Sequence, residues 1–127
     1  MAGKIIADTL ETGAGADIAT SYVVEGVAKH WHTSDGSGTV AINDSLNTSS
    51  MTDRGAGRYT HDFINNFLTL HFSPTSNCNS NTASSWGDGG NATYDKTTSE
   101  YKSGSNNTSG VATDSNYVQM AAWGDLA

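Results

Sequence analysis

Short strand-like segments separated by glycine-rich turns constrain the fold of this chain more than any other feature. The stretch from Val27 to Phe63 alternates polar and apolar residues, and two of its turns share one design. In each, an aspartate (Asp35 or Asp53) is followed within three residues by Gly-x-Gly, with an apolar residue two positions later. Alternation is typical of half-buried strands, and glycine supplies the backbone freedom that tight turns need. The stretch therefore predicts β-hairpins.

The same pattern extends over the rest of the chain. Asn43–Ser50 reads as turn-prone, and Ser73–Asn91 as a long polar loop or a pair of irregular strands. No segment has helical periodicity. Six or more short strands with Gly, Asn and Ser turns predict an all-β fold, an antiparallel β-sandwich or small barrel of jelly-roll type. The strands are expected at Tyr22–Thr33, Thr39–Leu46, Arg58–Phe63, Phe67–Phe72 and Asn116–Trp123, with minor ones at Ala92–Tyr94 and Glu100–Lys102.

A chain of 127 residues has the length of one domain. We expect residues 1–26, which are rich in small and polar side chains, to form an N-terminal arm, and residues 27–127 to form the β-domain. Only 35% of the residues are hydrophobic. The aromatic residues and the small charged fraction favour an ordered fold over a disordered one. A small polar protomer can complete its core by association, so we expect a homo-oligomer.

Charge and cysteine content exclude several classes of protein. The net charge is −7, and the six basic residues are scattered, which argues against nucleic-acid partners. No segment is apolar enough for membrane insertion, and the N-terminus lacks the apolar run of a signal peptide. Cys78 is the one cysteine, so no intrachain disulfide can form. These features predict synthesis in a reducing cytoplasm.

The Val27–Phe63 stretch resembles a module of tail-fibre-like and other virion proteins of bacteriophages, especially phages of aquatic bacteria. Before Phe63, the matching residues are Val27-Ala28-Lys29 with Trp31, Gly36 and Gly38, Thr39-Val40-Ala41-Ile42, Asp44-Ser45-Leu46-Asn47, Ser49-Ser50-Met51 with Asp53, Gly55 and Gly57, and Tyr59-Thr60. The N-terminal Lys4–Leu10 also resembles the opening of such proteins. His30 and His32 depart from the module's pattern.

The resemblance implies a non-enzymatic structural component of the virion, usually a homotrimer, that binds other virion proteins or a host surface. The arm would attach to the particle, and its apolar residues Ile5, Ile6 and Leu10 are the candidate contacts. Such a protein is a tail fibre, a receptor-binding subunit, or, as an alternative, a capsid decoration or cement protein. A small polysaccharide-cleaving enzyme is a further alternative, although no acid residue lies in a recognisable catalytic motif.

His30-x-His32 is the sharpest candidate for metal binding. On a strand, residues i and i+2 point to the same face. Two imidazoles are too few for a closed site, but three chains around a threefold axis would offer six nitrogens to a transition metal such as iron or nickel. The alternative is a pair of surface or interface histidines that flank a core tryptophan. Apart from this trimer-axis site, no cofactor is expected.

Three aromatic residues in the polar C-terminal half are candidates for contact with host glycans: Trp86, Tyr94 and Tyr101. Aromatic rings stack on sugar faces, and the surrounding amides and hydroxyls can bond to sugar hydroxyls. The alternative is that these rings anchor long loops to the core. Trp86 is the strongest candidate for exposure because Gly87, Gly89 and Gly90 follow it.

Overall fold

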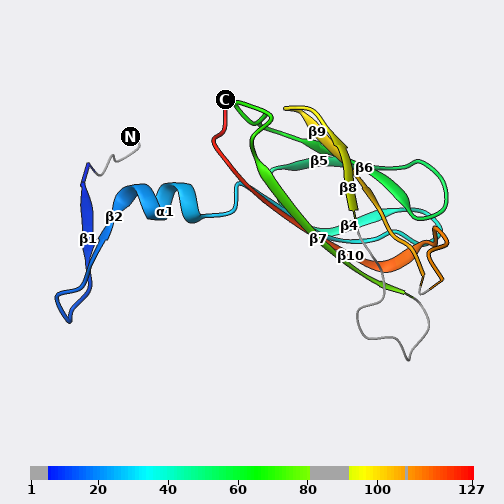
Figure 1. The fold of residues 1–127 in the computed structure, drawn as a ribbon, viewed down its shortest axis with the longest axis horizontal. Helices are drawn as coiled ribbons and strands as arrows, with labels where there is room; N and C mark the ends of the chain where they lie inside the picture. The colour runs from blue at the N-terminus through cyan, green and yellow to red at the C-terminus, as the bar shows by residue number, and fades with distance from the viewer. Residues whose placement is uncertain (1–5, 81–91, 108) are drawn as a thin grey trace.

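The computed structural model describes residues 6–80, 92–107 and 109–127 (Figure 1). The described chain is mostly β, with one short helix. The elements are β1 (Thr9–Glu11), β2 (Asp17–Ala19), α1 (Thr20–Gly26), β3 (His30–Asp35), β4 (Ala41–Leu46), β5 (Thr48–Asp53), β6 (Arg58–Phe63), β7 (Ser73–Ser80), β8 (Ala92–Lys96), β9 (Glu100–Gly104) and β10 (Ser115–Trp123).

All strand pairs are antiparallel, which confirms the prediction of an antiparallel all-β fold. One four-stranded sheet has the order β4-β3-β10-β7, and a second has the order β5-β6-β9-β8. Strands β1 and β2 form a separate two-stranded sheet. Within the two four-stranded sheets, three consecutive pairs are hairpins: β3-β4, β5-β6 and β8-β9. The Gly-x-Gly turns lie in the first two of these hairpins, as the repeated turn design predicts.

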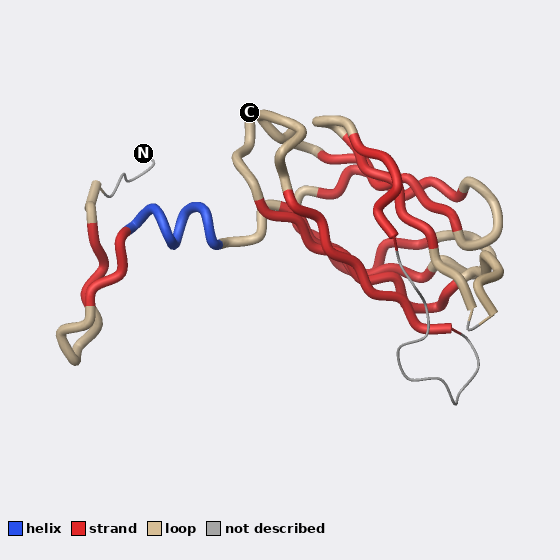
Figure 2. Tube along the Cα trace, viewed as in Figure 1, coloured by secondary structure: helices blue, strands red, loops and turns tan. Residues whose placement is uncertain are grey.

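One hydrophobic core contains side chains from both four-stranded sheets. In Figure 2 the strands of these two sheets lie together, apart from the N-terminal segment. Strand β10 contributes alternate side chains from one sheet, and β5, β6 and β9 contribute aromatic and methionine side chains from the other. Alternation places every second side chain of a strand on the same face, so short polar strands can still supply a continuous core. Its members are Met51, Tyr59, Phe63, Phe67, Phe72, Tyr101, Val118, Met120 and Ala122.

The N-terminal segment differs from its predicted form. Residues expected to begin the strand Tyr22–Thr33 instead form helix α1, which contains no buried residue. A strand needs a neighbour to satisfy its backbone N–H and C=O groups, whereas a helix satisfies them internally. Residues 20–26 extend away from the two large sheets (Figure 1), which explains why the helix replaces the strand. Among the described residues, no helix is long and apolar enough to cross a membrane.

The segment Phe67–Phe72 is also not the strand that its alternation predicts. It forms turns with one isolated bridge between Phe67 and Leu126, and strand β7 begins only at Ser73. The rings of Phe67 and Phe72 stack with their centroids 4.3 Å apart, and both are buried. Aromatic stacking therefore turns the chain inward at both ends of the segment.

Strands β5 and β7 occupy segments that the sequence predicts as turns or loop. Strand β5 overlaps the turn-prone run that ends at Ser50, and β7 covers the start of the long polar loop. Strand β7 pairs with β10 along its whole length, from Ser73 to Ser80. Its regularity therefore comes from backbone hydrogen bonds to a distant partner strand, which local composition does not reveal.

Candidate functional site

Three buried histidines from the two four-stranded sheets lie against one another. His30 and His32 belong to β3 of one sheet, and His61 belongs to β6 of the other. Their exposed fractions are 0%, 1% and 0%. The alternation of β3 turns both of its histidines inward and leaves Trp31 half-buried on the opposite face. We call His30, His32 and His61 the histidine cluster.

The rings of the cluster contact one another and their aromatic neighbours. The ring centroids of His30 and His32 are 5.5 Å apart, and those of His32 and His61 are 4.7 Å apart. The His61 ring stacks on Tyr101 of β9 at 4.8 Å, and His30 meets Phe63 edge-on at 4.9 Å. The histidines therefore occupy positions that aromatic core residues would take in an ordinary β-protein.

Two of the rings have one hydrogen bond each. His30 Nε2 lies 3.1 Å from the hydroxyl oxygen of Thr48, and His61 Nε2 lies 2.7 Å from that of Ser103. The Thr48 hydroxyl donates to the carbonyl oxygen of Trp31 at 3.4 Å, which leaves its oxygen free to accept a hydrogen bond from His30 Nε2. This arrangement favours the neutral tautomer of His30 with its proton on Nε2.

The remaining ring nitrogens have no hydrogen-bond partner among the described residues. These atoms are Nδ1 of His30, Nδ1 of His61 and both nitrogens of His32. Burial lowers the pKa of His30 to about 3, with a further contribution from His32, and burial lowers the pKa of His32 to about 4. The pKa of His61 also lies well below its usual value, first through burial and then through His32 and His30. All three rings are therefore neutral at pH 7.

This placement does not favour the predicted metal site on a threefold axis, because His30 and His32 point into the interior of their own chain. That site stays a prediction. The expected alternative, surface or interface histidines that flank a core tryptophan, is reversed in the single chain, since both histidines are buried and Trp31 is half-buried on the opposite face. Among residues 6–80, 92–107 and 109–127, no group of three or more His, Cys, Asp or Glu side chains is placed to hold a metal ion.

The predicted glycan contacts do not come together in the described structure. Tyr101 is fully buried beneath the histidine cluster, so its prediction as a surface contact is wrong. Its alternative role, anchoring its segment to the core, matches its position. Tyr94 belongs to β8, but its side chain lies outside the described part of the chain, as does Trp86. For Trp86 and Tyr94 the contact stays a prediction.

The predicted attachment residues lie at the start of the arm. Ile6 is 82% exposed and Leu10 of β1 is 46% exposed, while Ile5 lies outside the described residues. Exposed apolar side chains continue along β2 and α1. The arm therefore presents an apolar surface that the described residues do not cover.

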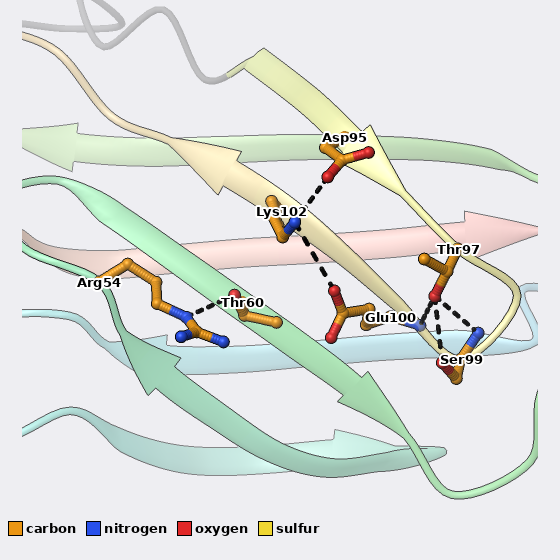
Figure 3. A network of polar contacts seen from close by, with 7 residues as sticks. All are labelled: Arg54, Thr60, Asp95, Thr97, Ser99, Glu100 and Lys102. Atoms are coloured by element: carbon orange, nitrogen blue, oxygen red, sulfur yellow. Dashed lines mark hydrogen bonds and ion pairs between the residues drawn. The ribbon is translucent and has the colours of Figure 1, made fainter.

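The outer face of the sheet that contains β5, β6, β8 and β9 is polar (Figure 3). Lys102 forms ion pairs with Asp95 and Glu100, and the guanidinium of Arg54 donates to the hydroxyl of Thr60 at 3.1 Å. Ion pairs that solvent reaches add little to stability, so these contacts make this face polar rather than hold the sheet together.

A shallow hollow lies where helix α1 approaches the C-terminal end of the chain. The carboxylates of Glu25 and Asp125 line it together with His71, Thr69, Phe72 and Gly124. Two carboxylates at one hollow are the feature that a glycan-cleaving enzyme would require.

The sequence predicts that His30 and His32 share one face of a strand, but it does not predict that His61 joins them. His61 alternates with Tyr59 and Phe63 along β6, so the three side chains share one face, and all three are buried. Two aromatic neighbours on one face were therefore the available signal that His61 is a core residue. The contact with His32 depends on how the two sheets face each other, which alternation within one strand cannot show. Comparisons of the chain with protein-family models, with curated proteins and with solved structures found no match.

Proposed function

We propose that this protein is a non-enzymatic structural subunit of a bacteriophage particle, held to the particle by residues 1–26 and presenting its β-domain outward. Two features support the proposal. The first is the resemblance of Val27–Phe63 to a module of phage virion proteins. The second, which carries the most weight, is the uncovered apolar surface of the arm.

The arm has little internal support for the structure it adopts. Helix α1 has seven residues, no side-chain cap and no buried residue, and the β1-β2 sheet has only two strands. Helices this short and isolated hairpins are marginal in water. The arm therefore requires contact with another surface, and its chemistry indicates an apolar one. Its exposed apolar side chains are Ile6, Leu10, Ile18, Tyr22, Val23, Val24 and, just beyond it, Val27.

We infer further that the two four-stranded sheets form a jelly-roll-like sandwich and that three chains associate. Ile64, Leu68 and Leu70 support an association, because they are 65%, 60% and 52% exposed in the segment that precedes β7. Leu126, which lies near Phe67 through the isolated bridge, extends this apolar group. Sedimentation of the purified protein tests the trimer, which requires three times the 13.3 kDa mass of one chain.

The attachment role is tested by incorporation of arm variants into particles. Val24→Asp places a charge on the exposed face of α1, where the side chain is 61% exposed. Val111→Asp is the matched control, since Val111 is 58% exposed but lies on the β-domain. We expect Val24→Asp to reduce the protein in purified particles at least tenfold, and Val111→Asp to leave it unchanged. Equal incorporation of both variants would show that the arm is not the attachment segment.

The outward surface would contact the host. The polar outer face of the second large sheet and the polar sequence around Trp86 suit a carbohydrate surface better than an apolar one. Trp86→Ala is expected to weaken binding of the protein to host cells, with Trp31→Phe as a control at a half-buried position of β3. Unchanged binding by Trp86→Ala would remove Trp86 from the receptor contact.

The position of the protein on the particle separates a fibre from a decoration protein. Electron microscopy of labelled particles distinguishes a subunit that projects from the tail, collar or vertex from one that lies flat across capsomers.

The enzymatic alternative rests on the hollow that Glu25 and Asp125 share. Turnover of a host polysaccharide by the purified protein, abolished by Glu25→Gln or Asp125→Asn, would replace the structural role with that activity.

A further inference from the structure

We propose that the histidine cluster is an acid-sensitive lock between the two large β-sheets: neutral rings hold the domain closed, and uptake of protons by these rings opens it. The lock would act on the domain in any assembly, so it does not depend on the role of the arm.

The geometry couples protonation directly to the contact between the sheets. His30 and His32 come from β3, and His61 comes from β6 of the facing sheet. With ring centroids 4.7 Å apart, His32 and His61 would bring two positive charges together across the interface between the sheets. Like charges in a buried environment repel strongly because water does not screen them. Separation of the sheets removes this repulsion and hydrates the rings.

Among the described residues, the contacts place no carboxylate against a ring of the cluster. The nearest one they identify is Asp114, whose Oδ1 lies 3.5 Å from the hydroxyl oxygen of Tyr59, and Asp53 also acts on that phenol. Tyr101 of β9 and Tyr59 of β6 face the cluster, and burial raises the pKa of both phenols, which stay neutral. Cys78 of β7 is buried in the same core, and burial raises the pKa of its thiol. From β5, Thr48 contributes only a hydroxyl, as does Ser103 from β9.

On the side of the cluster near Phe63, the charged side chain that the contacts identify is a cation. Lys96 of β8 lies over the ring of Phe72, which in turn contacts Phe63 beside His30. Within the described part of the chain, the ion pairs all involve Lys102 on the outer face. A proton on the cluster would therefore remain uncompensated, and opening is the way to accommodate it.

The direction of the pH effect follows from the protons that each state binds. The pKa of each histidine is lowered in the folded protein, so the unfolded chain binds more protons below the ordinary histidine value of about 6.5. Stability is therefore complete above that pH and falls as the pH decreases towards the lowered values, about 4 for His32 and about 3 for His30. From pH 7 to pH 5, each neutral buried histidine shifts the folding equilibrium towards the open state about 25-fold.

The test is the equilibrium unfolding of the full chain by urea at pH 7 and pH 5. Three histidines predict a combined shift on the order of 10⁴-fold between these two values. The range stops at pH 5 because most carboxylates titrate below it. His32→Phe should reduce the shift about 25-fold, since it removes one titrating ring without breaking a hydrogen bond. His32→Leu is the second variant if phenylalanine does not fit the core.

His71→Gln is the matched control, because His71 is exposed and lies outside the cluster. It should keep the full shift of the unmodified chain. A folding equilibrium that changes less than tenfold between pH 7 and pH 5 would overturn the proposal, as would an equal shift in the unmodified chain and in the folded His32 variant.

A second measurement keeps the proposal testable even if both His32 variants fail to fold. Ring signals of the native protein can be followed by NMR as the pH falls from 8 to 5. The signals of His30, His32 and His61 should keep their neutral shifts until the folded signals disappear together. Titration of any of these rings within a persistently folded protein would show that the cluster accepts protons without opening, and would overturn the lock.

Discussion

The rings of His32 and His61 lie with centroids 4.7 Å apart, although one residue belongs to β3 and the other to β6 of the facing sheet. Both side chains are buried, yet their bonding differs. His61 Nε2 bonds to the hydroxyl of Ser103, while neither ring nitrogen of His32 has a partner among the described residues. The same substitution at these two positions should therefore have different consequences.

At pH 7.5, where the cluster is neutral, His32→Phe should change the free energy of unfolding by less than about 1 kcal/mol or should stabilise the protein, because it removes buried polar atoms that make no bond. His61→Phe should cost about 1–3 kcal/mol, because it leaves the buried Ser103 hydroxyl without its partner. Urea unfolding measures both values. A larger loss for His32→Phe than for His61→Phe would contradict the assigned bonding.

The two Gly-x-Gly turns should differ in their tolerance of alanine. Gly38 has a φ of +61° and open space around its missing side chain, so Gly38→Ala should cost only about 1–2 kcal/mol of backbone strain. Gly57 has a nearly identical φ of +62°, but an added Cβ would collide with the backbone of Ser105 and lie 2.6 Å from the nitrogen of Thr113.

Gly57→Ala should therefore cost roughly 2–3 kcal/mol more than Gly38→Ala, since overpacking adds to the strain. Thermal unfolding of the two variants gives the comparison, in which Gly38→Ala is the control for φ alone. Equal losses of stability in the two variants would mean that the backbone around the second turn moves aside without cost. That result would contradict the close approach of Gly57 to Ser105 and Thr113.

The hydroxyl of Tyr59 joins the turn after β3 to the start of β10, two segments that are far apart in the sequence. It donates to the carbonyl oxygen of Gly36 at 3.0 Å and accepts the backbone N–H of Ser115 at 3.3 Å. Tyr59→Phe should cost about 1–3 kcal/mol, because both buried backbone groups lose a bond. Tyr117→Phe, at a side chain that is 59% exposed, should change stability by less than about 0.5 kcal/mol. Urea unfolding measures both changes. A change in the free energy of unfolding for Tyr59→Phe as small as that expected for Tyr117→Phe would contradict the two hydrogen bonds assigned to the Tyr59 hydroxyl.

Removal of residues 1–26 should leave the β-domain folded. None of residues 6–26 is buried, and both large sheets begin after this segment, at His30. We expect the free energy of unfolding to change by less than about 1 kcal/mol, because no core contact is lost. Cooperative urea unfolding of the truncated chain measures this. Loss of a cooperative transition would mean that the arm is part of the fold rather than an attachment segment.

The bounds of two strands could be predicted from the local alternation of polar and apolar residues. Arg58–Phe63 has the predicted bounds as β6, and β10 begins one residue before its predicted start at Asn116. Both segments alternate clearly and contain aromatic or branched side chains, so one face was recognisable as the core face. Strand β7 offered no such signal, since its residues are mostly polar and its order depends on pairing with β10.

The sequence by itself determined the strand period, the positions of the two Gly-x-Gly turns and the aromatic residues available for a core, because these depend on neighbours within a few residues. Tertiary structure decided the rest. Pairing with distant strands turned His30 and His32 inward and Trp31 outward, and the facing of two sheets placed His61 against them. Since burial sets the charge of an imidazole, only the tertiary structure converted a polar motif into a neutral core cluster.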